Sequence, residues 1–100
     1  MNQDEIITVV ANVRAQADSV EFVKNELLKL VQLSRQEDGC LNYDLHQSID
    51  DPALFVFHEN WTSEQALETH AGSAHIKANR EALKGKVLAR EVTRLRRAEP

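Results

Sequence analysis

The segment from Tyr43 to His75 holds most of the side chains that could perform acid–base chemistry. All four histidines of the chain lie there, together with a carboxylate, Glu59, that sits among aromatic residues. A neutral imidazole can accept a proton near neutral pH without special tuning. These side chains therefore predict that the protein transfers protons to or from a bound molecule.

His70 is the strongest candidate for a general base. A helix is expected to begin at Thr62, which forms a capping-box pair with Gln65, and His70 falls on its inward stripe beside Leu67 and Ala71. An imidazole on an apolar face can also be a hydrogen-bonded structural residue, so both interpretations stay open.

The histidine spacing does not predict a metal site. His70 and His75 are five residues apart, which on a continuous helix turns them roughly 140° away from each other. Helical zinc ligands usually lie at i and i+4. An interruption of the helix at 72–73, the Gly-Ser pair, would change this geometry.

Two further polar residues are expected on otherwise apolar strands. Alternation over 54–61 puts Glu59 on one face with Phe55, Phe57 and Trp61, where desolvation would raise its pKa unless a donor pairs with it. Asn12 lies on the apolar first strand and needs a partner or a ligand. A structural hydrogen bond would also account for each residue: one from a helix N-terminus or an arginine for Glu59, and one to neighbouring backbone for Asn12.

Composition excludes several classes of function. The 100-residue chain carries a net charge of −4 with a pI near 5.5, which argues against a nucleic-acid groove. It has no GxSxG motif or glycine-rich loop, so a nucleotide cofactor is not expected. The lone Cys40 and the polar, acidic start favour a cytoplasmic protein without membrane insertion.

The order of predicted elements is β-α-β-β-α-β within one domain over 1–100. Strands are expected at 6–13, 40–46, 54–61 and 87–95, with helices between the first and second and between the third and fourth. The first helix is expected to open with the pair Asp18 and Glu21 and to close at Gly39. This order predicts an α+β, ferredoxin-like fold with an antiparallel sheet and both helices on one face. The bare face, with Val9, Ala11 and Val56, then predicts a homodimer.

The sequence resembles the antibiotic biosynthesis monooxygenase family. The resemblance rests on Gly39-Cys40-Leu41-Asn42-Tyr43, Glu59-Asn60-Trp61, His70 and Ser73-Ala74-His75, and it spans nearly the whole chain. It implies a dimeric α+β barrel with a pocket in each protomer. It also implies an oxidoreductase that oxidises quinols or polyphenols with O₂ and uses no cofactor and no metal.

The resemblance assigns a role to each candidate residue. His70 becomes the proton acceptor, Asn12 a polar contact and Trp61 a pocket wall. Glu59 would either orient His70 or support the end of its strand. The substrate would be contacted by a second set, namely Tyr43, Phe57, Asn60 and His75.

Three alternative functions stay open. Asn12 and Trp61 also match a pair used by haem-degrading relatives, but Arg80 stands where those enzymes need an axial histidine. Other relatives isomerise phosphorylated dicarbonyl signals, for which Arg14, Lys77 or Arg80 could hold a phosphate. The chain could also be a small-molecule binder or stress-response protein without oxygenase activity.

Overall fold

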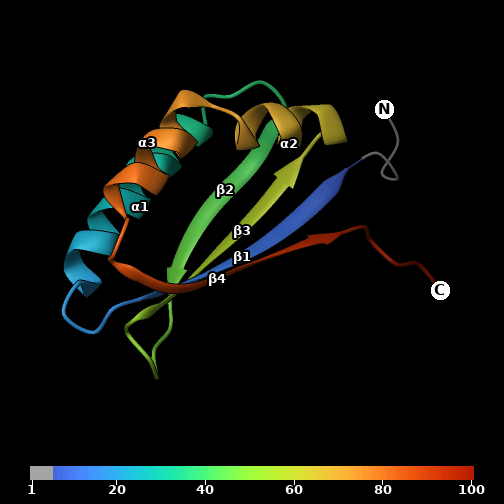
Figure 1. Cartoon of the computed structure of the whole chain (residues 1–100). Coiled ribbons are helices and arrows are strands. Elements are labelled where there is room, and N and C mark those ends of the chain that lie inside the picture. Colours follow the sequence, from blue (N-terminus) through green and yellow to red (C-terminus); the bar gives the residue numbers. More distant parts are fainter. Residues whose placement is uncertain (1–5) are drawn as a thin grey trace.

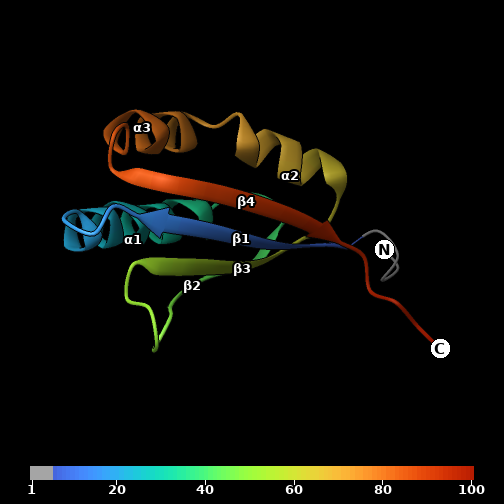
Figure 2. The same cartoon turned by 60° about the horizontal axis from the view of Figure 1, so that its bottom comes forward.

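The computed structural model describes residues 6–100 and has the predicted ferredoxin-like architecture. The elements are β1 (Ile7–Ala15), α1 (Val20–Ser34), β2 (Cys40–Gln47), β3 (Leu54–Trp61), α2 (Glu64–Ala71), α3 (Ala74–Ala82) and β4 (Val87–Leu95). The strands form one antiparallel sheet in the order β2-β3-β1-β4. The helices cover one face of this sheet, and β4 forms a margin beside α2 and α3 (Figures 1 and 2). None of these helices is long and apolar enough to cross a membrane.

The register of β1 decides which side chains face the helices. Val9 pairs with Glu59 and Ala11 with Phe57, and both partners are buried under the helices. Val9 is accordingly only 2% exposed. The expectation that Val9 and Ala11 lie on the bare face was therefore wrong, because consecutive apolar residues leave a strand's orientation unspecified until its partner is known.

The core lies between the sheet and α1. The helix buries Val23, Leu27, Leu30 and Val31 in this core, and it lies beside β2. Tyr43, Phe55 and Trp61 are the largest fully buried side chains. The aromatic face predicted for β3 is thus confirmed.

Both predicted capping boxes are displaced by one residue. Ser19, rather than Asp18, is the N-cap of α1, and its side chain makes no capping bond. Ser63, rather than Thr62, caps α2 and accepts a hydrogen bond from the Ala66 amide. Helix α1 also ends earlier than expected, at Ser34, so its end does not involve Gly39.

A break at Gly72 and Ser73 divides the second predicted helix. Gly72 is the C-cap of α2, and the Ser73 side chain caps α3 by accepting from the Ile76 amide. The break rotates α3, so that its buried residue is Asn79. Ala71, Ala74 and Ala78, which a continuous helix would bury, are exposed.

Glu59 is a carboxylate inside this core. It is 4% exposed, and its Oε1 accepts a hydrogen bond from the Trp61 indole nitrogen at 3.0 Å. Burial raises the pKa of Glu59 to about 7, although the indole bond acts in the opposite direction. The carboxyl group therefore titrates near neutral pH instead of near its ordinary pKa of 4.5.

Gly39 holds the link between α1 and β2 against α2. Its φ is +85°, and a Cβ placed there would lie 2.6 Å from the Ala66 Cβ and 2.7 Å from the Thr62 Oγ1. Its carbonyl also accepts a hydrogen bond from the Thr62 amide at 2.9 Å. A side chain at position 39 would push this link away from α2.

We expect Gly39→Ala to lower the free energy of unfolding by at least about 2 kcal/mol, since it combines a left-handed backbone with steric overlap. Gly85→Ala is the matched control, because its φ is +75° but the space around it is open. It should cost only about 1 kcal/mol. Urea unfolding of both variants tests this, and equal losses would contradict the close approach at Gly39.

Glu59 should also make stability depend on pH. Its pKa rises from 4.5 to about 7 on folding, so the folded state binds more protons between these values and stability falls as pH rises through them. Relative to Glu59→Gln, the wild type should lose up to about 3 kcal/mol by pH 8. Urea midpoints from pH 4 to pH 8 measure this, with Glu68→Gln on the exposed side of α2 as control. Parallel curves for wild type and Glu59→Gln would disprove the shift.

Candidate functional site

A cavity of about 150 Å³ lies between the sheet and the helices. Its walls are mainly apolar side chains from β1, α1, α2 and α3, including Val9, Leu27, Leu30, Leu67 and Ile76. The polar side chains on its border are Tyr43, Glu59, His70, Asn79, Arg80 and Arg90. This combination of apolar walls with a few polar groups is typical of a small-molecule site.

His70 is held at the cavity by aromatic rings and by a carboxylate. It lies in the last turn of α2 and is 5% exposed. Its ring centroid lies 4.5 Å from that of Trp61 and 5.2 Å from that of Tyr43. The Nδ1 atom is 2.6 Å from Oε2 of Glu37, which fixes the orientation of the ring.

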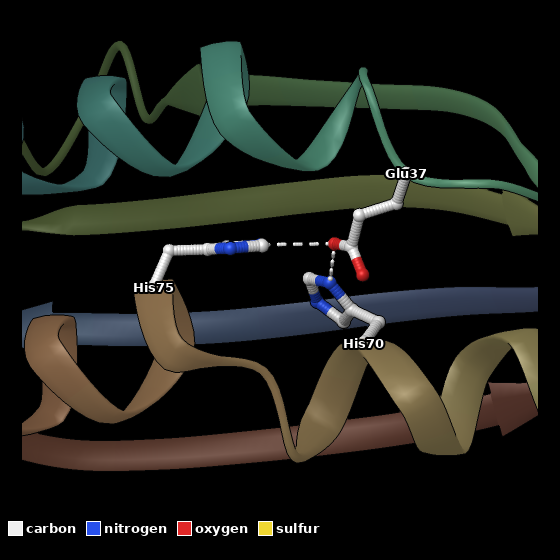
Figure 3. Close-up of side chains that lie close together, drawn as sticks. All are labelled: Glu37, His70 and His75. Atoms are coloured by element: carbon white, nitrogen blue, oxygen red, sulfur yellow. Dashed lines mark hydrogen bonds and ion pairs between the residues drawn. The ribbon is translucent and has the colours of Figure 1, made fainter.

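Glu37 bridges two histidines. The same oxygen, Oε2, that meets His70 also lies 2.9 Å from Nε2 of His75 (Figure 3). The three side chains come from the link after α1, the end of α2 and the start of α3. Sequence reasoning missed Glu37, and the only signal for it was an acidic residue two positions before Gly39.

The helix break is what brings the two histidines together. On a continuous helix they would point away from each other, and that argument was used against a metal site. Because α2 ends at Ala71 and α3 begins at Ala74, both imidazoles instead face Glu37. The geometric argument against a metal site was therefore wrong.

Burial sets the protonation of the groups around the cavity. It lowers the pKa of His70, although the Glu37 carboxylate acts in the opposite direction. Burial, together with the charge of Glu59, raises the pKa of Tyr43, so its phenol stays protonated. Cys40 has a pKa raised to about 11, chiefly by burial, which excludes a thiolate nucleophile near neutral pH.

Five of the predicted site residues border the cavity. They are His70, Glu59, Tyr43, Phe57 and Asn12. Asn12, however, alternates with the inward-facing Ala11 and Val13, so its side chain belongs to the opposite face of the sheet.

The other three predicted residues lie outside the cavity lining. Trp61 is fully buried and packs against the His70 ring without lining the cavity itself. Asn60 points to the open face, where it bonds to Thr8 and Asn42. His75 approaches Glu37 from α3 and borders a different hollow, beside α1.

Two arginines border the cavity where α3 faces β4. Burial lowers the pKa of Arg90, and the charge of the neighbouring Arg80 adds to this effect. Within residues 6–100 neither guanidinium is paired with a carboxylate. Sequence reasoning named Arg80 but missed Arg90, which looked like one charged residue of an alternating strand.

The chain is similar to proteins described as monooxygenases. It is 35% identical over 86 residues to "Putative monooxygenase Rv0793" of Mycobacterium tuberculosis, covering 86% of this chain and 83% of the relative. It is 31% identical over 93 residues to "Probable quinol monooxygenase YgiN" of Escherichia coli, covering 83% of this chain and 89% of that protein.

A solved structure gives the same fold. PA3566 from Pseudomonas aeruginosa is 31% identical, with a TM-score of 0.92 that covers 99% of this chain and 100% of the other. The family model for antibiotic biosynthesis monooxygenase matches residues 6–82. Together with the ferredoxin-like fold, this match shows that the chain belongs to the antibiotic biosynthesis monooxygenase family.

Proposed function

We propose that the protein is a cofactor-independent monooxygenase that oxidises a quinol or polyphenol with O₂. The observation that carries this proposal is the placement of His70, a buried imidazole on the wall of a mainly apolar cavity. Its Nδ1 is engaged by Glu37, so the other ring nitrogen, Nε2, is the one available to a substrate hydroxyl.

The reaction begins when Nε2 of His70 accepts a proton from the substrate hydroxyl. The Glu37 carboxylate stabilises the imidazolium that forms, because it already contacts Nδ1 at 2.6 Å. The electron-rich substrate anion passes an electron to O₂, and the two radicals combine at a ring carbon. The His70 imidazolium returns its proton to the peroxide formed there. Loss of water, with the hydrogen of that carbon, then leaves one oxygen atom as a carbonyl of the oxidised product, so that substrate and O₂ supply all the electrons and atoms required.

The apolar walls support this chemistry by excluding water. A dry site strengthens the interaction between the substrate anion and the imidazolium and protects reactive oxygen intermediates from bulk solvent. The phenol of Tyr43 stays protonated next to His70, so it can donate a hydrogen bond to the substrate oxygen without competing for its proton. Trp61 keeps the His70 ring in place by packing against it.

We also propose that the working unit is a homodimer. Leu88, Val92 and Leu95 are large apolar side chains that stay exposed on β4, a marginal strand of the sheet. Val92 and Arg90 of this strand border the cavity as well. A second copy packed against β4 would bury these residues and complete the wall of the cavity, which is smaller alone than the ~300 Å³ usual for ligand sites.

A second candidate function follows from Arg80 and Arg90. Two neighbouring guanidiniums beside a cavity, without a carboxylate partner in residues 6–100, are suited to a phosphate or carboxylate. This favours the isomerisation of a phosphorylated dicarbonyl compound as the alternative. Arg14 is not available for that role, because it pairs with Asp51 and does not line the cavity. A cytoplasmic location, expected from the sequence, stays a prediction under either function.

His70→Ala and His70→Gln should both lower oxygen uptake at least about a hundredfold with a menaquinol or hydroxyanthraquinol that the wild type oxidises, because each removes the base. An oxygen electrode measures the rate. His46→Gln is the control, since it removes an exposed imidazole from β2, the sheet edge farthest from β4.

Circular dichroism should confirm that each His70 variant is folded. If the folded variants retain the wild-type rate, His70 is not the base. If the wild type consumes no oxygen with any member of the panel, the oxygenase proposal is wrong. Binding of a phosphorylated dicarbonyl that Arg80→Gln weakens would then support the second candidate.

The dimer has its own test. The double variant Leu88→Lys, Leu95→Lys should sediment and scatter light as a monomer, because burying two lysines at an interface is unfavourable. Ile49→Lys is the matched control, since Ile49 is 96% exposed in the turn between β2 and β3. It should leave the mass unchanged. A wild-type mass of one chain at micromolar concentration would contradict the dimer.

A further inference from the structure

Three metal-ligating side chains meet at one point beside the cavity. Nδ1 of His70 and Nε2 of His75 both approach Oε2 of Glu37, at 2.6 Å and 2.9 Å (Figure 3). The ligand atoms of all three residues lie within 4.8 Å of one another. We propose that Glu37, His70 and His75 bind one divalent transition-metal ion of the zinc type, and that the bound ion inhibits the enzyme.

The ligand set is suited to zinc rather than to calcium or magnesium. Two imidazole nitrogens and one carboxylate oxygen are ligands that Zn²⁺ accepts, whereas Ca²⁺ and Mg²⁺ prefer oxygen alone. Tetrahedral ligands about 2.0–2.1 Å from zinc stand about 3.3 Å apart. The two nitrogen–oxygen distances would therefore need to lengthen by less than about 1 Å, which a rotation of the Glu37 side chain can supply.

Electrostatics favours a cation at this point. The Glu37 side chain is 15% exposed, and the side chains of His70 and His75 are 7% and 18% exposed. Within residues 6–100, the only ion-pair partners of Glu37 are His70 and His75. A partly buried carboxylate whose ion-pair partners are imidazoles, rather than Lys or Arg side chains, is a favourable place for a divalent ion.

The site has a route to solvent on the side away from the cavity. Glu37 borders a surface hollow together with Gly39, Thr62 and Ala66. A metal ion can enter from this hollow, and a water molecule can complete its coordination there. Glu37 and His75 do not line the substrate cavity, so the ion would lie behind His70 rather than among the substrate contacts.

Inhibition follows because the ion would bind Nδ1 of His70 and not Nε2, and this part of the inference rests on the proposed function. The atom of His70 that faces Glu37 is Nδ1, so a metal bound there leaves the ring proton on Nε2. Nε2 is the nitrogen that the proposed mechanism uses as the base, and once protonated it cannot accept the proton of the substrate. Zinc would thus block the base without entering the cavity.

The test uses the full chain without an affinity tag, freed of metal by a chelator and titrated with zinc chloride. Calorimetry should give one site per chain. Trp61 is the only tryptophan in the chain and lies 4.5 Å from His70 between ring centroids, so its fluorescence should change over the same titration. Failure of calorimetry to detect saturable binding at micromolar zinc would overturn the site.

Substitutions of single residues test which side chains bind the zinc ion. Glu37→Gln and His75→Gln keep hydrogen-bonding side chains but remove a carboxylate or an imidazole, and each should weaken zinc binding at least about tenfold. His46→Gln should bind as the wild type does. If the Glu37 and His75 variants are folded and bind zinc normally, the ion occupies another site and the assignment is wrong.

Oxygen uptake separates this inference from the proposed function. If the wild type oxidises a quinol, stoichiometric zinc should slow it at least about tenfold, and a chelator should restore the rate. Full activity with zinc bound would overturn inhibition. If the wild type oxidises no quinol, the proposed function fails, while calorimetry on the same variants still decides whether the metal site exists.

Discussion

The contact on which the rest of the site depends is the Glu37 carboxylate shared by two imidazoles. Neither the link after α1 nor the break between α2 and α3 is held by regular secondary structure, and this carboxylate joins them. A carboxylate that is only 15% exposed needs donors, and His70 and His75 supply them. Gly39 makes the contact possible, because only a residue without Cβ lets the link approach α2 so closely.

The sequence predicted those features that repeat along the chain. Alternation along Leu54–Trp61 placed Glu59 among the buried aromatics. The family assignment needed short motifs such as Glu59-Asn60-Trp61, and the match over residues 6–82 agrees with it. Such patterns are local, so a single sequence carries them in full.

Features that depend on distant segments could not be predicted in this way. Glu37 is 33 residues from His70 and 38 from His75, so nothing in its own neighbourhood indicates the contact. The orientation of Val9 depends on its pairing with Glu59 of another strand. The effect of Ser73 also needed the structure, because a cap can end a helix or merely bend it, and here it turned His75 toward Glu37.

The charges around the cavity explain why one imidazole can have two opposed uses. Burial keeps Tyr43 protonated and raises the pKa of Glu59 to about 7, so burial disfavours negative charge on both side chains. A substrate anion formed there needs positive charge, which protonated His70 can supply only if Glu37 stabilises it from behind. The same arrangement attracts a metal ion, since the carboxylate stabilises any cation at Nδ1. A proton on Nδ1 leaves Nε2 of His70 free to act as the base, whereas a divalent ion on Nδ1 keeps Nε2 protonated and inactive.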